Sequence, residues 1–213
     1  MDRQFTLSLR EDTRKEEDTF RMAILGHTKV GKSTVSCRLV NLWTTLSRQT
    51  KEKGRKGRKG RKGCSDLGIK GRSLTVNFVD IAVNTVCPFL QPLPSCDAYV
   101  LVYSLVCDES YEAVVAAKDH IIQQEGSSVP IVFVANKKDI ADSVDQTQRM
   151  YQHLNINCEW ENGHMEISAE MDDTVMPVLE QIMKRHQKYV SEKKRASRVS
   201  KTFPSVRNLF SRN

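Results

Sequence analysis

Short runs of apolar residues alternate with longer stretches of helical periodicity along most of this chain of 213 residues. The runs are typical of strands that are buried on both faces, and the longer stretches repeat apolar residues three and four positions apart. The predicted strands are residues 22–25, 74–81, 99–105, 129–135 and 165–168, and the predicted helices are 35–46, 110–124, 144–154 and 175–189. Such alternation predicts an α/β fold with a mainly parallel central sheet and helices on both faces.

Three segments lack this pattern. Residues 1–19 are polar and charged with little periodicity, and we interpret them as a flexible N-terminal arm. A Lys/Gly/Arg-rich repeat at about residues 48–66 has low complexity and predicts an exposed insertion. Residues 190–213 are rich in Lys, Arg and Ser, and form a basic tail. The expected organisation is one domain of residues 20–189 with these three appendages.

The net charge of +7 is unevenly distributed. Residues 51–63 contain eight Lys or Arg and one Glu, and residues 184–213 contain ten Lys or Arg and one Glu. The rest of the chain has 15 basic and 24 acidic residues, so the positive charge belongs to the appendages. The repeat could contact phosphoinositides or RNA or act as a nuclear signal, but it has no interleaved aromatic residues for base stacking, which argues against nucleic acid as a partner.

The chain shows no apolar signal stretch at its start and no run long enough to span a bilayer. Its six cysteines are scattered without a C-x-x-C pair, so the sequence suggests neither a zinc site nor a disulfide framework. We therefore expect a cytoplasmic protein, with the inner face of the plasma membrane or the nucleus as alternative locations.

A phosphate-binding loop follows the first predicted strand. The motif G-x-x-x-x-G-K-[ST] is complete in Gly26, His27, Thr28, Lys29, Val30, Gly31, Lys32 and Ser33, and Thr34 continues into the next helix. In this motif the backbone N–H groups surround phosphate oxygens, the lysine contacts the β- and γ-phosphates, and the hydroxyl ligates Mg²⁺. The strand before the loop and the helix after it are the context that a true phosphate loop requires. The sequence therefore predicts binding of a nucleoside triphosphate.

Further motifs follow in the order that is typical of guanine-nucleotide-binding proteins. Asp80 near the end of the second strand is placed to hold Mg²⁺, which makes Ser33 and Asp80 the predicted metal residues. Asn136, Lys137, Lys138 and Asp139 form N-K-x-D after the fourth strand, and Ser168 and Ala169 follow the fifth. With these motifs, residues 20–189 resemble the Ras-like small GTPase superfamily.

The resemblance implies a phosphate-loop G domain that binds GTP or GDP with Mg²⁺. An Asp139 carboxylate can accept hydrogen bonds from the N1–H and N2–H₂ groups of guanine, which adenine lacks, and such sites discriminate by about 10⁴. By resemblance, Asn136 braces the loop, Lys137 lies along the base, and the Ala169 N–H meets the guanine carbonyl oxygen. Glu170 stands where the family usually has Lys.

The departures from the family pattern concentrate where hydrolysis is controlled. The family's D-x-x-G-Q becomes D-x-x-V-N, with Val83 and Asn84 at its last two positions, and Thr28 occupies a place that is commonly Gly. No residue is assigned as catalytic. The threonine that should contact Mg²⁺ in the first switch has no secure counterpart; the candidates are Thr44, Thr45 and Thr50. These changes predict slow or impaired hydrolysis.

The C-terminal tail offers no cysteine for prenylation. In this respect the chain resembles lipid-free branches of the superfamily, the estrogen-regulated growth inhibitor-like and Rad/Gem-like groups. A tail pattern of Phe203, Val206, Leu209 and Phe210 among basic residues is typical of an amphipathic helix that could bind an anionic membrane or calmodulin.

Two hypotheses from different functional classes follow. The first is a monomeric guanine-nucleotide-binding signalling protein that contacts protein effectors or regulators and hydrolyses GTP weakly. The alternative is a pseudo-GTPase scaffold that binds a protein partner independently of nucleotide.

Overall fold

The computed structural model describes residues 3–6, 18–54, 74–82, 93–141, 145–171 and 175–202, and for 3–6, 18–19, 47–54, 74–82 and 197–202 it describes the backbone alone. The strands are β1 (Arg3–Thr6), β2 (Asp18–Gly26), β3 (Leu74–Ala82), β4 (Ala98–Ser104), β5 (Ile131–Asn136) and β6 (Gly163–Glu166). The helices are α1 (Lys32–Gly54), α2 (Asp108–Glu125), α3 (Gln146–Leu154) and α4 (Met176–Thr202), with the short helices η1 (Lys138–Ile140) and η2 (Asn155–Glu159).

The strands form one sheet in the order β1-β3-β2-β4-β5-β6. Every neighbouring pair is parallel except β1 and β3, which run antiparallel. All side chains of β4 and β5 are buried, which is why these strands are continuous apolar runs in the sequence. The predicted α/β fold with a mainly parallel sheet is confirmed.

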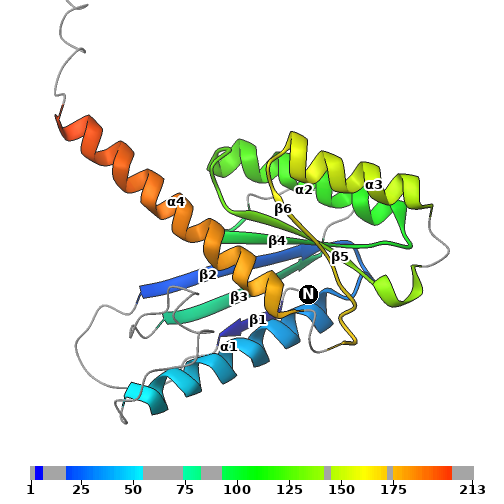
Figure 1. Cartoon of the computed structure of the whole chain (residues 1–213), viewed down its shortest axis with the longest axis horizontal. Coiled ribbons are helices and arrows are strands. Elements are labelled where there is room, and N and C mark those ends of the chain that lie inside the picture. The colour runs from blue at the N-terminus through cyan, green and yellow to red at the C-terminus, as the bar shows by residue number, and fades with distance from the viewer. Residues whose placement is uncertain are drawn as a thin grey trace, which may run out of the picture.

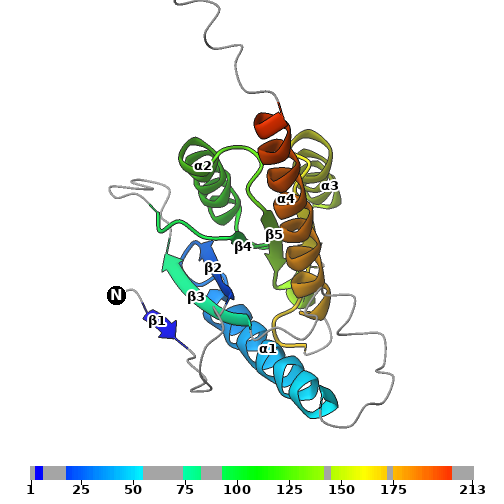
Figure 2. The same ribbon diagram turned by 90° about the vertical axis from the view of Figure 1, so that its left-hand side faces the viewer.

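Helices cover both faces of the sheet (Figures 1 and 2). On one face, Leu39 and Trp43 of α1 and Leu179 of α4 pack in one apolar cluster with β2, β4 and β5 side chains. On the other face, Val114 and Ile121 of α2 pack in a second cluster with side chains from the same strands. The two clusters hold the sheet between layers of helix, as the sequence predicts.

Local signals fix the ends of two helices. The Asp145 side chain caps α3 by accepting a hydrogen bond from the Thr147 N–H, so the helix begins slightly later than predicted. Helix α2 begins with Asp108 and Glu109, whose charges favour a helix N-terminus. It ends before Gly126, which has a φ of 90°.

The parallel register brings the carboxyl ends of four strands to one edge of the sheet. Gly26, the last residue of β2, pairs with Ala82 of β3 and with Val102 of β4. Ser104 at the end of β4 pairs with Asn136 at the end of β5. The loops that carry the predicted motifs therefore leave the sheet on the same side, where open α/β sheets bind ligands.

Three features differ from the sequence prediction. Helix α1 continues to Gly54, so the first part of the expected insertion is helical. Helix α4 continues to Thr202, past the boundary expected at residue 189. Arg3–Thr6, expected to lie in an arm without regular structure, pairs with β3. The remainder of the Lys/Gly/Arg repeat and the tail pattern from Phe203 to Phe210 lie outside the described residues.

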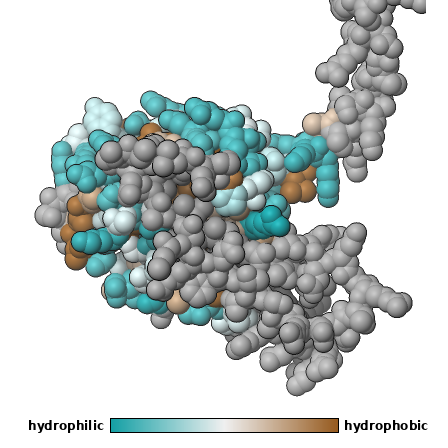
Figure 3. Space-filling model, turned by 180° about the vertical axis from the view of Figure 1, so that it is seen from behind, coloured by the Kyte–Doolittle hydropathy of each residue, from teal (hydrophilic) through white to brown (hydrophobic). Residues whose placement is uncertain are grey.

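On the face seen in Figure 3, hydrophilic side chains cover most of the coloured surface, and hydrophobic ones form small separate groups. None of the helices in the described part of the chain combines the length and the apolar character needed to cross a membrane.

Candidate functional site

The phosphate-loop motif forms a tight turn between β2 and α1. Gly26 lies so close to β4 that a Cβ atom there would be 2.1 Å from the Val102 carbonyl oxygen. Lys29 has a φ of 62° and Gly31 a φ of 90°. A Cβ atom on Gly31 would lie 2.3 Å from Nδ2 of Asn136, so this position needs glycine for both its backbone conformation and its neighbour.

The loop is ordered around its lysine. The Lys32 ammonium group donates a hydrogen bond to the His27 carbonyl oxygen at 3.1 Å. The Val35 N–H, in the first turn of α1, donates to the Gly31 carbonyl oxygen at 3.0 Å. Ser33 and Thr34 are exposed at the start of this helix, and Thr28 is exposed in the turn. A concave turn at a helix N-terminus with a lysine beside it fits the phosphates of a nucleotide.

Asn136 joins this loop to a second one. Its side chain is almost wholly buried, with 3% exposed. The amide Nδ2 donates to the Val30 carbonyl oxygen at 2.8 Å, and the amide Oδ1 accepts from the Ala169 N–H at 2.9 Å. Its own carbonyl oxygen accepts from the Leu105 N–H at 3.0 Å. One side chain thus fixes the phosphate loop relative to the loop after β6.

The two loops predicted to contact the base lie side by side. The Lys138 N–H donates to the Ile167 carbonyl oxygen at 3.0 Å, which ties the N-K-x-D segment to the Ser168–Ala169 segment. Lys137 has a left-handed backbone with a φ of 66°. Asp139 is exposed within η1, whereas Ser168 and Ala169 are buried. The resemblance to small GTPases implies that the Ala169 N–H contacts a guanine oxygen. In this structure the Ala169 N–H donates a hydrogen bond to Oδ1 of Asn136.

One residue of this region was not identified from the sequence. Arg38 of α1 donates a hydrogen bond from Nη2 to the Glu170 carbonyl oxygen at 2.8 Å. The two residues are 132 positions apart, and the acceptor is a main-chain atom. No local sequence pattern indicates such a contact.

The predicted metal residues lie at the same end of the sheet. Asp80 in β3 pairs with Ile24, two residues before the glycine that opens the phosphate loop. Ser33 is the second residue of α1. Only the backbone of Asp80 is described, so Ser33 and Asp80 stay predicted metal residues.

The three threonines considered for the first switch are all inside α1. The Thr44 hydroxyl donates to the Val40 carbonyl oxygen at 2.8 Å, and the Thr45 hydroxyl donates to the Asn41 carbonyl oxygen at 2.9 Å. At 1.5 Å per residue, Thr44 lies about 16 Å and Thr50 about 25 Å along the helix from Ser33. Neither distance permits a ligand shared with Ser33, since Mg²⁺ ligands lie about 2 Å from the ion. Their candidacy was wrong, because all three threonines lie inside α1 and far along it from Ser33.

Other predicted positions lie outside the described residues. These are Val83 and Asn84 of the altered hydrolysis motif.

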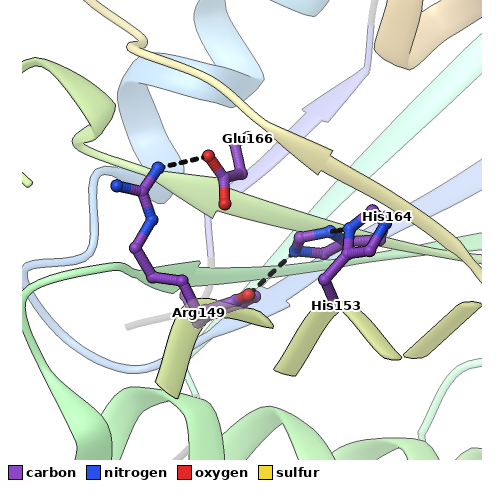
Figure 4. Close-up of polar contacts among 5 residues, drawn as sticks. Arg149, His153, His164 and Glu166 are labelled. Atoms are coloured by element: carbon purple, nitrogen blue, oxygen red, sulfur yellow. Dashed lines mark hydrogen bonds and ion pairs between the residues drawn. The ribbon is translucent and has the colours of Figure 1, made fainter. Parts of the chain in front are cut away.

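A separate polar cluster lies between α3 and β6 (Figure 4). His164 is buried; its Nε2 contacts the Tyr103 hydroxyl at 2.9 Å, and its Nδ1 contacts Nδ1 of His153 at 2.9 Å. Arg149 and Glu166 form an ion pair beside them. Burial, and then the neighbouring His153, lower the pKa of His164 to about 4. An open cavity of about 370 Å³ adjoins the cluster, lined by Gln146, Arg149, Met150, His153 and Glu166. None of the predicted nucleotide-site residues lines it.

Comparison with known proteins agrees with this geometry. The sequence model of the Ras family matches residues 21–188. The chain belongs to the Ras family. This match covers the whole described sheet except β1 and the first residues of β2, and it includes both loops that Asn136 connects.

Individual Ras-family relatives are distant. The chain is 23% identical over 175 residues to the GTP-binding protein Rhes of Mus musculus, covering 75% of this chain and 61% of Rhes. It is 27% identical over 172 residues to the GTP-binding protein rhb1 of Schizosaccharomyces pombe, covering 79% and 88%. It is 26% identical over 176 residues to the human Ras-like protein family member 10B, covering 78% and 85%. The match thus spans about three fifths of the length of Rhes.

Proposed function

We propose that this Ras-family protein binds guanine nucleotide with Mg²⁺, acts in signalling through protein effectors or regulators, and hydrolyses GTP slowly. The observation that carries the proposal is the buried Asn136 side chain, which joins the phosphate loop to the Ser168–Ala169 loop. This connection sets the spacing between the loop predicted to bind the phosphates and a loop predicted to contact the base. The names of Rhes and rhb1 as GTP-binding proteins support the same assignment.

The residues divide between the two ends of the nucleotide. The backbone N–H groups of the phosphate loop and the Lys32 ammonium group bind the phosphates, and Asp139 and Lys137 bind the base. Ser33 and Asp80 hold Mg²⁺, which neutralises the charge that develops on the phosphates. The Ala169 N–H already has an acceptor in Asn136, so a guanine oxygen shares this donor with the amide.

Slow hydrolysis follows from the residues around the γ-phosphate. Val83 replaces a glycine, Asn84 replaces a glutamine and is one methylene shorter, and Thr28 adds a side chain to the loop. The threonines available for the first switch are held in α1. Even well-equipped members hydrolyse GTP at only about 10⁻⁴ s⁻¹ without a partner, and arginine fingers contribute about 10³ to 10⁵. Without the usual glycine, glutamine and first-switch threonine, we expect GTP hydrolysis to be slow.

A specific observation supports the alternative function of a scaffold. The Lys32 ammonium group has an acceptor in the His27 carbonyl, and the Ala169 N–H has one in Asn136, both within the protein. A loop whose polar groups are satisfied internally can keep its shape when empty.

The basic C-terminal part of α4 supports contact with an anionic membrane. The side chains of residues 191–196 are all exposed, and Lys193, Lys194 and Arg195 are among them. Each such cation near an anionic surface contributes about 1 kcal/mol. Vesicles that contain phosphatidylserine should retain the protein at low salt and release it at high salt, whereas equal retention on neutral vesicles would contradict this part. Binding to calmodulin without binding to vesicles would favour calmodulin as the partner of the C-terminal tail.

The nucleotide carried by the purified protein tests the proposal. We expect denaturation and chromatography to release GTP or GDP from the wild type but none from Lys32→Ala, because that variant lacks the phosphate-binding cation. Asp139→Ala should lose preference for guanine over adenine nucleotides. Bound GTP indicates crippled hydrolysis, and bound GDP indicates turnover. A folded wild-type protein without nucleotide, and with unchanged partner binding in Asp139→Ala, would support the scaffold.

A further inference from the structure

A contact between α1 and the base loop lies beyond the motifs that define the site. Arg38 is half-buried in the second turn of α1, and its guanidinium group donates to the Glu170 carbonyl oxygen at 2.8 Å. The Glu170 side chain is exposed. The contact therefore depends on the residue at position 38 and on the main chain, and any residue at position 170 supplies the same acceptor.

The turn that Arg38 contacts is held at several points. The Ala169 N–H donates to Asn136 on one side, and the Met171 N–H donates to the Ser168 carbonyl oxygen within the turn. The Arg38 contact is made to the carbonyl that follows Ala169. The peptide group before Ala169 and the one after Glu170 are thereby tied to different parts of the molecule, the first to the end of β5 and the second to α1.

Helix α1 makes this contact significant for a ligand. The same helix carries Lys32 and Ser33 at its first two positions, next to the phosphate loop. A rigid helix that holds the phosphate residues at its start and the base loop through its second turn fixes the spacing between the two ends of a nucleotide. A hydrogen bond from a charged guanidinium is about twice as strong as a neutral one.

We infer that Arg38 is a positioning residue, which holds the Ser168–Met171 turn in the place where it meets the base and thereby slows the dissociation of guanine nucleotide. The inference rests on the proposed function. It adds a residue that touches neither phosphate nor metal and acts through the main chain of the turn.

The first measurement is the dissociation rate of a fluorescent GDP analogue. Arg38→Met keeps a stem of similar size but removes the donors, so we expect dissociation about tenfold faster than in the wild type, the effect of losing one charge-assisted hydrogen bond. Arg38→Lys should lie between the two, because an ammonium group has donors but not the planar fork of a guanidinium group.

Matched controls separate positioning from other roles. Glu170→Ala keeps the carbonyl acceptor and should dissociate at the wild-type rate. Lys184→Met removes a positive charge from the exposed surface of α4 and should also leave the rate unchanged. Tripolyphosphate has phosphates but no base, so its affinity should be the same for wild type and Arg38→Met. A change of less than twofold in Arg38→Met, or an equal loss of tripolyphosphate affinity, would overturn the inference.

Hydrogen exchange of the backbone amides keeps the inference separate from the proposed function. If the wild type binds no guanine nucleotide, the proposed function fails, whereas the contact can still be tested in the empty protein. Faster exchange at Ala169 and Met171 in Arg38→Met, with unchanged exchange in β4, supports a positioning role. Unchanged exchange throughout contradicts it.

Discussion

At the scale of single residues, the candidate site depends on close approaches that leave no room for side chains. Gly31 combines a φ of 90° with a neighbouring amide nitrogen 2.3 Å from its would-be Cβ. Asn136 supplies that amide and uses both of its polar atoms in the connection. A methyl group at position 31 therefore disturbs the phosphate loop and the base loop together.

We expect Gly31→Ala to reduce the free energy of unfolding by about 1 to 3 kcal/mol from backbone strain alone, with a further loss from the displaced Asn136. Nucleotide retention should fall as well. Urea unfolding and chromatography of the bound nucleotide measure the two effects.

Gly126→Ala is the matched control, because Gly126 also has a φ of 90° but a Cβ atom there would meet nothing within 4 Å. This variant should show the cost of strain and keep its nucleotide. Equal stability losses and equal nucleotide contents in the two variants would show that the Asn136 contact has no effect.

The sequence indicates these residues to different degrees. The glycines of the phosphate loop and the N-K-x-D motif are local patterns with a known physical purpose, so their positions could be predicted. The contact between Arg38 and Glu170 joins residues 132 positions apart through a main-chain acceptor, and no residue type at position 170 reveals it.

At the scale of elements, α1 differs most from its prediction. Its apolar pattern fades after Leu46, which is why the sequence analysis ended it there. The following residues 47–53 contain neither glycine nor proline, and the helix ends at Gly54, a residue that commonly stops helices. Helix-forming polar residues extend a helix beyond the part that packs on the core, and amphipathic periodicity alone misses that extension.

The length of α1 predicts which hydroxyl groups serve the metal. We expect Thr44→Val to leave the Mg²⁺ dependence of nucleotide binding unchanged, because the Thr44 hydroxyl is bonded to the Val40 carbonyl inside the helix. Ser33→Ala should weaken that dependence by about tenfold or more, since it removes a proposed ligand of the ion. Nucleotide dissociation measured across a series of Mg²⁺ concentrations gives both results. A loss of Mg²⁺ dependence in Thr44→Val would contradict the placement of this threonine.

Strand β1 could not be predicted from its own residues. Its partner is β3, and the antiparallel pairing places Arg3 opposite Asp80 and Thr6 opposite Asn77. Four residues are too few to show the alternation that is typical of a strand. The pairing depends on β3, which is far from β1 in the sequence. The inner strands, by contrast, are buried on both faces and were recognisable from composition.

At the scale of the whole molecule, the buried histidine of β6 links stability to pH. The pKa of His164 is about 4 in the folded protein, against an ordinary value of about 6.5 in the unfolded chain. The unfolded chain therefore binds the proton more tightly, and the free energy of unfolding falls as the pH decreases from about 6.5 towards 4. The loss expected from this group by pH 4.5 is about 2 to 3 kcal/mol.

A comparison with His164→Gln isolates this contribution. Glutamine keeps a polar group near Tyr103 but does not titrate, so the variant should lose about 2 to 3 kcal/mol less than the wild type between pH 7.5 and 4.5. Burial also lowers the pKa of His186, but this group is common to both proteins and cancels in the comparison. Urea unfolding at several pH values provides the measurement, and parallel pH profiles would refute the assignment.

The positions of the end of α1 and the start of β3 limit how far the chain between them can reach. Helix α1 ends on the side of the sheet where β2 and β3 begin (Figure 1), and the nine residues of β2 separate that side from the phosphate loop by about 30 Å. Nineteen residues join Gly54 to Leu74, and the greatest distance that they can span is about 70 Å. The path from the end of α1 to the phosphate loop and back to the start of β3 is only slightly shorter, about 60 Å. They include no threonine, so no residue of this stretch matches in type the threonine that the family uses in the first switch.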